Sequence, residues 1–194
     1  MKILIIFAHP KTRSFNSAIR DEIINTSNDC GHEVEVRDLY VLNFDPVLTS
    51  QELDGTFNGI QANDVTLEQN YITWADKIVF IYPLWWGSMP AILRGYLDRV
   101  LSYGFAYCSG TDSSVGLLTN KSIVIINTIG SKELNYHQNG MLSALETIAS
   151  HGIFNFCGAN IEKYFHFCNI HNIDLEERLD MLEQVKAYFS SLSR

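Results

Sequence analysis

The residues around positions 9 to 16 suit the binding of a phosphate group. They include His9, Lys11, Thr12, Arg13, Ser14 and Asn16. They follow an apolar run and precede a segment with helical periodicity, and the first N–H groups of a helix can bind an anion. The glycine-rich motifs of Rossmann and P-loop proteins are both missing here. The stretch therefore predicts a phosphate site of another kind.

A second stretch, Tyr82 to Pro90, holds two adjacent tryptophans, Trp85 and Trp86, beside Gly87. Flat apolar side chains next to free backbone N–H groups are what a planar aromatic cofactor requires. The alternative is that the two tryptophans are interface or core residues. The pattern favours contact with a ring for at least one of them.

A third stretch combines Thr128 and Gly130 with the hydrogen-bond donors Tyr136 and His137. A flavin matches all three stretches, with its phosphate on the first and its ring on the second and third. Reduction of a flavin places negative charge on its N1/O2 edge, which fixed donors must stabilise. We expect these donors to be the backbone N–H groups around residues 128 to 130 and the Tyr136 hydroxyl.

The elements that must position these stretches can be read from the hydrophobic pattern. Residues 2–8, 77–82 and 122–127 are apolar runs typical of strands buried on both faces. Residues 33–37 alternate as an edge strand does, and 159–167 predict a fifth strand. Helices are expected after Ser14, from Pro90 as first helical residue, from Met141 to about Gly152, and after Asp174 with Glu177 in a capping box. Residues 39–70 are predicted to be an irregular surface excursion, with a short helix before Trp74.

This alternation of strands and helices predicts a doubly wound α/β fold with a five-stranded parallel sheet, as one domain over residues 1–194. In such sheets ligands bind beyond the carboxyl ends of the strands, where the strand order reverses. The three stretches each follow a buried strand. They are therefore expected to converge on one site.

Composition excludes several classes of function. The 194 residues carry a net charge of −8, so the basic surface of a duplex nucleic-acid binder is missing. No apolar run is long enough for a transmembrane helix, and the first strand is too short for a signal peptide. The four cysteines form no CxxC pair and no zinc pattern, so no metal site is predicted. These features predict a cytoplasmic protein with reduced thiols.

The chain also resembles a known family. The segments HPKTRSFN, DLYVLNFDPVL, YPLWWGSMPAILRGYLDRVLSYGFAY and FCG are similar, in collinear order up to about residue 168, to the NAD(P)H:quinone oxidoreductase family of flavodoxin-like flavoproteins. The resemblance implies strand order 2-1-3-4-5, a homodimer, and a flavin that carries hydride from NAD(P)H to quinone-like acceptors in a ping-pong sequence. The residues implied at the flavin phosphate are His9, Ser14, Phe15 and Asn16; those at the ring are Pro83, Leu84, Trp85 and Trp86; those at the pyrimidine edge are Thr128 and Gly130.

The third stretch departs from the family pattern. Ile129 stands where the family usually has a glycine, a replacement that either tilts the loop or changes backbone access to the flavin. Asn139 and Gly140 fall where mammalian members have a histidine, and His137 is out of register. Tyr136 is therefore the one residue assigned a catalytic role.

The sequence favours a cytosolic flavin-dependent NAD(P)H dehydrogenase acting on quinones or other flat two-electron acceptors. A flavin-binding regulatory or electron-carrier subunit, such as an ancillary protein of a potassium-efflux system, remains open, as does a flavin-free interaction protein. FAD is expected rather than FMN, from the Ser14-Phe15-Asn16 match and the length of the 39–70 excursion. The choice between NADH and NADPH and the identity of the acceptor are left open.

Overall fold

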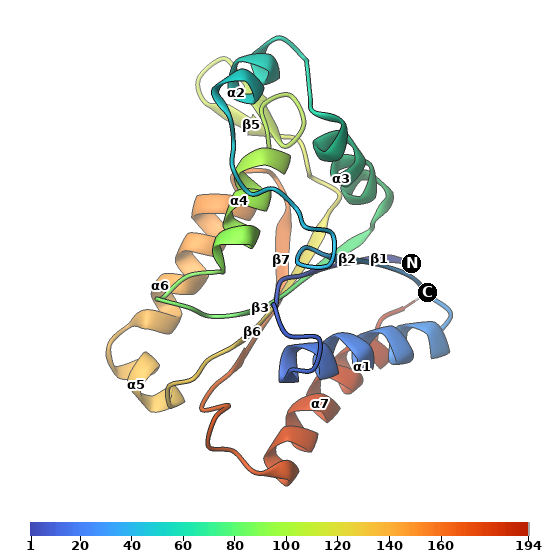
Figure 1. Cartoon of the computed structure of the whole chain (residues 1–194), viewed down its shortest axis with the longest axis vertical. Helices are drawn as coiled ribbons and strands as arrows, with labels where there is room; N and C mark the ends of the chain where they lie inside the picture. The colour runs from blue at the N-terminus through green and yellow to red at the C-terminus, as the bar shows by residue number, and fades with distance from the viewer. Residues whose placement is uncertain (194) are drawn as a thin grey trace.

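The computed structural model describes residues 1–193 and forms a central sheet with helices on both faces (Figure 1). In chain order the elements are β1 (Lys2–Phe7), α1 (Phe15–Asp29), β2 (Glu33–Asp38), α2 (Ser50–Phe57), α3 (Asn63–Trp74), β3 (Lys77–Pro83), α4 (Ala91–Val100), β4 (Tyr107–Ser109), β5 (Ser114–Gly116), β6 (Ser122–Thr128), α5 (Glu133–Gln138), α6 (Met141–Thr147), the π-helix η1 (Ile148–Phe154), β7 (Asn160–Phe167) and α7 (Leu175–Ser190).

The central sheet has the order β2-β1-β3-β6-β7, and all its strands are parallel. Counted along the sheet's own strands, this order is 2-1-3-4-5, so the predicted flavodoxin-like topology is confirmed. Every residue of β3 is buried, because helices cover both faces of the sheet. The edge strand β2 alternates exposed Glu33 and Glu35 with half-buried neighbours, as expected.

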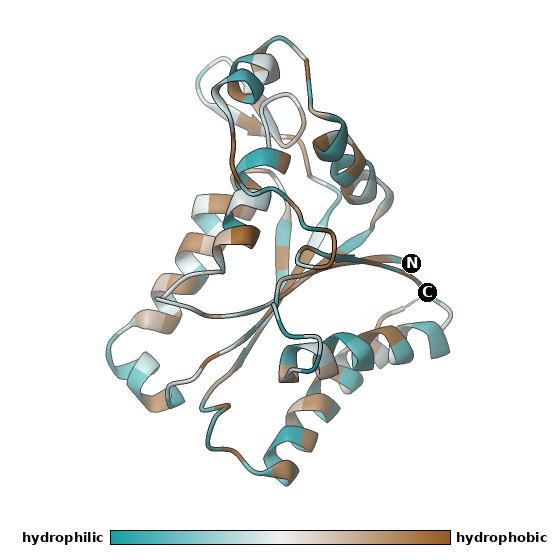
Figure 2. Cartoon of the chain, viewed as in Figure 1, coloured by the Kyte–Doolittle hydropathy of each residue, from teal (hydrophilic) through white to brown (hydrophobic). Residues whose placement is uncertain are grey.

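Side-chain alternation divides the core into two layers. Ile3, Ile5 and Val79 pack under α1 and α7, while Leu4 and Phe80 face α4 and the α6–η1 segment. Helices α1 and α7 lie side by side on one face of the sheet (Figure 1). Hydrophobic residues are concentrated on the strands and on the helix faces turned toward them (Figure 2).

Two predicted helix starts are confirmed by their caps. The Ser14 hydroxyl accepts a hydrogen bond from the Ser17 backbone N–H, and the Ser17 hydroxyl accepts one from the Ser14 N–H. Asp174 and Glu177 form the same reciprocal arrangement at the start of α7. Pro90 differs from its prediction: it is the N-cap of α4, and the first helical residue is Ala91.

The 39–70 excursion is more regular than predicted, because it contains α2 and most of α3. Its helices are held by a buried arginine of α4. The Arg99 guanidinium donates hydrogen bonds to the carboxylates of Glu52 and Asp64 and to the Asp45 carbonyl oxygen. Those partners lie 35 to 54 residues away in sequence, so local pattern could not reveal them.

The structure differs from the sequence prediction in three further places. The short helix α5 occupies part of the expected polar loop after Thr128. A two-stranded hairpin joins β4 and β5. The helix that begins at Met141 continues past Gly152 as a π-helix ending at Phe154.

Across residues 1–193 no helix has the length and apolar character needed to cross a membrane. The same residues contain no group of three or more His, Cys, Asp or Glu side chains placed to hold a metal ion. None of the four cysteines forms a disulfide, and burial raises the pKa of Cys157 and Cys168 to about 11.

Candidate active site

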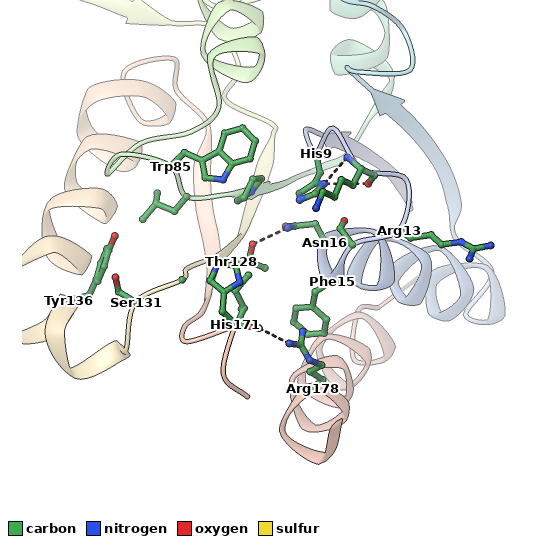
Figure 3. Close-up of a pocket in the computed structure, with 16 residues that line it drawn as sticks. His9, Arg13, Phe15, Asn16, Trp85, Thr128, Ser131, Tyr136, His171 and Arg178 are labelled. Atoms are coloured by element: carbon green, nitrogen blue, oxygen red, sulfur yellow. Dashed lines mark hydrogen bonds between the residues drawn. The ribbon is translucent and has the colours of Figure 1, made fainter. Parts of the chain in front are cut away.

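A cavity of about 490 Å³ opens at the carboxyl ends of the strands, within the size range of small-molecule sites (Figure 3). Its walls come from the loops that follow β1, β3, β6 and β7 and from the first turns of α1 and α7. The lining residues are His9, Lys11, Arg13, Ser14, Phe15, Asn16, Pro83, Leu84, Trp85, Thr128, Gly130, Ser131, Tyr136, Ile170, His171 and Arg178.

The structure therefore brings together nearly all the residues named from the sequence. Thr12, His137 and Trp86 do not line this cavity, and the Trp86 side chain is fully exposed. Trp85 and Ser88 pair through both backbone hydrogen bonds, and the residues between them, Trp86 and Gly87, both have positive φ. This is the geometry of a type I′ turn. The turn sends Trp85 into the cavity and Trp86 out to solvent, so the structure places only one of the two tryptophans at this wall.

The start of α1 lines the cavity and presents donors that suit an anion. Phe15 and Asn16 occupy the first two helical positions, whose N–H groups have no partner within the helix itself. The positive end of the helix dipole adds to their attraction for an anion. The Ser14 hydroxyl is engaged in the cap but still lines the cavity. This end of the cavity matches the predicted phosphate site.

The charge of the cavity is opposite to that of the whole chain. Lys11, Arg13 and Arg178 line it, and none of its lining residues within the described part of the chain is acidic. The protein carries −8 overall, so this local concentration of cations is a specific feature of the site. An anionic ligand is therefore favoured here and disfavoured over much of the remaining surface.

His9 is a neutral hydrogen-bond donor in this arrangement. Burial lowers the pKa of its imidazole below the ordinary value, and the nearby Lys11 ammonium lowers it further, against a raising effect of the Lys11 backbone contact. The Lys11 backbone N–H donates to His9 Nδ1 over 3.0 Å. The Lys11 carbonyl oxygen also lies 3.3 Å from Nδ1, so the tautomer decides whether Nδ1 accepts or donates. In the tautomer that accepts at Nδ1, the proton lies on Nε2 and can be donated to a ligand.

Asn16 links the start of α1 to the end of β6, and both residues of this link line the cavity. Its Nδ2 donates to Thr128 Oγ1 over 2.9 Å, and both residues are buried. Its Oδ1 is buried with no hydrogen-bond partner among the described residues. A buried polar atom left without a partner is costly, so it marks a place that a ligand would complete.

A flavin nucleotide fits this donor set. The ribityl chain next to the phosphate carries hydroxyl groups that can donate to Asn16 Oδ1. If the carboxamide is turned over, the Thr128 hydroxyl can donate to Oδ1 while Nδ2 faces the phosphate, because a hydroxyl both donates and accepts. Either orientation satisfies the unpaired atom.

The loop after β6 differs from expectation at Ile129. Its N–H donates to the Phe167 carbonyl oxygen over 2.8 Å, and its own carbonyl accepts from Ile170 N–H over 3.2 Å. The side chain is buried. The Ile129 N–H is thus bonded to the β7 edge. Among the residues of this loop that line the cavity, the backbone N–H groups of Gly130 and Ser131 have no partner in the described part of the chain.

Tyr136 lies on α5 and lines the cavity, whereas the neighbouring His137 does not. The His137 side chain is exposed and its Nε2 lies 3.3 Å from Glu133 Oε1, one turn away on the same helix. Helical geometry separates the directions of consecutive residues by about 100°. It therefore directs one of the pair toward the cavity and the other away from it.

Sequence reasoning missed the contribution of the loop after β7. Ile170, His171 and Arg178 line the cavity, and Arg178 also lies over the Phe15 ring at 5.4 Å from its centroid. The available signal was topological, because this loop also follows a strand of the parallel sheet. Ser131 was missed as well, although it directly follows Gly130.

Comparisons with known proteins agree with this geometry. The family model for the flavodoxin-like fold matches residues 1–189. An uncharacterized NAD(P)H oxidoreductase of Haemophilus influenzae is 46% identical over 184 residues, which cover 94% of this chain and 91% of that protein. The chain belongs to the flavodoxin-like NAD(P)H:quinone oxidoreductase family. The expected family and enzyme class, an oxidoreductase, are thereby confirmed.

Two further members of this family show how widely the similarity extends. The human ribosyldihydronicotinamide dehydrogenase [quinone] is 33% identical over 180 residues, covering 82% of this chain and 78% of that protein. The structure of the NAD(P)H:quinone oxidoreductase from Methanothermobacter marburgensis superimposes with a TM-score of 0.89 at 27% identity, covering 100% of this chain and 99% of that one.

Proposed function

We propose that this protein is a flavin-dependent NAD(P)H dehydrogenase that passes hydride by a ping-pong sequence to quinone-like acceptors. The observation that carries the proposal is a single cavity with two contrasting parts. One part combines cationic side chains with the N-terminus of α1, and the other is a wall that includes the flat indole ring of Trp85. The family relatives support it, because their names describe NAD(P)H oxidoreductases and quinone dehydrogenases.

The proposal assigns tasks to three groups of cavity residues. The phosphate is bound by the backbone N–H groups of Phe15 and Asn16 and by the His9 Nε2–H. The cationic side chains of Lys11, Arg13 and Arg178 add to its attraction. Trp85, Pro83 and Leu84 form the ring wall, and the loop from Thr128 to Ser131 lies at its polar edge. A flavin held here supplies reversible hydride acceptance. The donors of this loop, with the Tyr136 hydroxyl, stabilise the negative charge that reduction creates.

The form of the flavin stays a prediction. FAD was expected partly because of the 39–70 excursion, yet no residue of that excursion lines the cavity. The Ser14-Phe15-Asn16 match is the ground that remains. A mass spectrum of the cofactor extracted from the purified protein would distinguish FAD from FMN.

We also propose that the protein acts as a cytoplasmic homodimer built from one domain per chain. A row of aromatic rings, Phe57, Tyr103, Tyr107 and Phe156, lies at centroid separations of 5.2, 5.8 and 5.0 Å. Phe57, Phe156 and Trp86 are exposed, which is unusual for a monomer's surface. A molar mass near 22.0 kDa by light scattering at micromolar concentration would contradict the dimer.

Two measurements test the function itself. Visible absorbance of bound flavin in the purified protein is expected, and its absence after reconstitution would support a flavin-free interaction protein. Turnover of menadione with NADPH or NADH is expected next. Flavin binding without turnover would instead favour the electron-carrier or regulatory role.

A further inference from the structure

The loop after β7 is attached firmly to the loop after β6. The Asn169 N–H donates to the Ser131 carbonyl over 2.8 Å, and the Ile170 N–H donates to the Ile129 carbonyl over 3.2 Å. Arg178 on α7 donates a side-chain hydrogen bond to the Ile170 carbonyl. Asn169 has a φ of 59°, a left-handed conformation that these bonds hold in place. These bonds fix residues 169 and 170, and with them the start of His171, relative to the loop after β6.

His171 is carried by this attached loop and lies against Gly130. A Cβ atom added to Gly130 would be 3.0 Å from His171 Cδ2 and 3.1 Å from Nε2. Both residues line the cavity (Figure 3). The glycine thus leaves room for the ring, and the ring lies next to the two free backbone donors of residues 130 and 131.

The donors of residues 130, 131 and 171 can be matched to one part of a bound flavin. In the proposed binding mode the phosphate lies at the start of α1, and Pro83, Leu84 and Trp85 line the apolar wall of the cavity. A flavin ring has one apolar edge and one polar edge, the pyrimidine edge with N1, O2 and N3. The donors of Gly130, Ser131 and His171 are complementary to the polar edge.

We infer that His171 donates a hydrogen bond to the pyrimidine edge of the flavin and there stabilises the charge that reduction creates. This inference rests on the proposed function. His9 serves the phosphate, and His137 points away from the cavity, so within the described residues His171 is the histidine of the cavity that remains for this role. Its position on the loop after β7 differs from the loop in which the sequence resemblance sought a histidine.

The first test measures the affinity of the apoprotein for riboflavin and for FMN by quenching of flavin fluorescence. His171→Ala should weaken both ligands by the same factor, about three- to ten-fold, as expected for one lost neutral hydrogen bond. His171→Gln, which keeps an N–H donor, should recover part of the loss. His137→Ala is the matched control and should change neither affinity. If FMN were weakened while riboflavin was unaffected, His171 would serve the phosphate and the inference would be wrong.

The second test measures the midpoint potential of the bound flavin. A hydrogen bond to a charged group is stronger than one to a neutral group, so the reduced flavin should lose about ten-fold more affinity than the oxidised one. For a two-electron couple this lowers the potential by roughly 30 mV. Gly130→Ala should shift the potential in the same direction, because the new methyl group displaces the imidazole. A potential unchanged in both variants would overturn the inference.

The two tests separate this inference from the proposed function. A wild-type protein that bound neither flavin after reconstitution would overturn both. A wild-type protein that bound flavin, with a His171→Ala variant of equal affinity and potential, would overturn the role of His171 alone. Melting temperatures of both variants within a few degrees of wild type are expected, because His171 lies on an exposed loop.

Discussion

The two ends of the parallel sheet differ in whether their buried polar groups have hydrogen-bond partners. At the amino end, the Lys77 ammonium is buried and bonded to Glu162, Ser122 and Tyr188. Glu162 sits at a register shift between β6 and β7, which directs its carboxylate toward α7. At the carboxyl end, Asn16 Oδ1 has no partner among the described residues, and the Gly130 and Ser131 N–H groups are free.

The amino end of the sheet, whose buried polar groups are paired, therefore stabilises the fold, and the carboxyl end has unpaired groups that a ligand can bind. A buried polar group with all its hydrogen bonds made contributes to the free energy of folding or costs little. A group with bonds left unmade lowers the stability of the empty protein, and that loss is recovered when a ligand binds. The amino end should therefore respond to mutation in stability and the carboxyl end in ligand affinity.

The largest effect is expected at the amino end. Lys77→Met removes one partner of a buried cluster and should lower the free energy of unfolding by about 2–3 kcal/mol, less than for a fully buried pair because the Glu162 side chain is 40% exposed. Lys186→Met is the matched control, since the exposed Lys186–Glu183 pair should contribute under about 0.5 kcal/mol. Urea unfolding of the two variants checks the difference. Equal losses would contradict the contrast between the sheet ends.

The same cluster predicts a dependence on acid. Although burial acts to raise it, the hydrogen bonds from Lys77, Ser122 and Tyr188 lower the pKa of Glu162 from 4.5 to about 2. A carboxyl group whose pKa is depressed by folding stabilises the protein above its unfolded pKa. This contribution is lost as the pH falls from about 4.5 toward 2. The slope of stability against pH in that window should be shallower in Lys77→Met than in the wild type.

A smaller effect, on affinity, is expected at the carboxyl end. Asn16→Ala should weaken flavin binding on the order of ten-fold, since it removes one or two hydrogen bonds at the phosphate and ribityl end. Ser14→Ala should weaken it to a similar degree and also lower stability, because the Ser14 hydroxyl caps α1. The exposed Asn58→Ala serves as control, and equilibrium dialysis measures the affinity. If both site variants bound flavin as tightly as the wild type, the phosphate would lie elsewhere.

The smallest effect is expected on the rate of flavin reduction. Tyr136→Phe should slow reduction by NADPH by less than about ten-fold, or under ~1.4 kcal/mol of barrier, because the backbone donors of residues 130 and 131 remain. His137→Ala should slow it less, since that side chain points away from the cavity. Anaerobic stopped-flow absorbance follows the reaction. A hundred-fold loss in the His137 variant would show that α5 rearranges to bring His137 to the flavin.

The sequence was sufficient for the features that depend on local pattern. Apolar runs identified β1, β3 and β6, the capping residues Ser14 and Asp174 marked two helix starts, and the rule for parallel sheets placed three loops at one edge. Nearly all the site residues named from those loops line one cavity. Each of these inferences uses residues that are close in the chain or a general property of the fold.

Tertiary structure decided the features that depend on a partner distant in the sequence. The Ile129 N–H is unavailable because Phe167 pairs with it across the sheet, and His171 faces Gly130 because Asn169 and Ile170 bond to the loop after β6. The packing of α2 and α3 depends on hydrogen bonds from Arg99 in α4 to Glu52 and Asp64. A sequence shows which groups can donate or accept hydrogen bonds. Their partners are chosen only when strand register and helix packing bring distant residues within bonding distance.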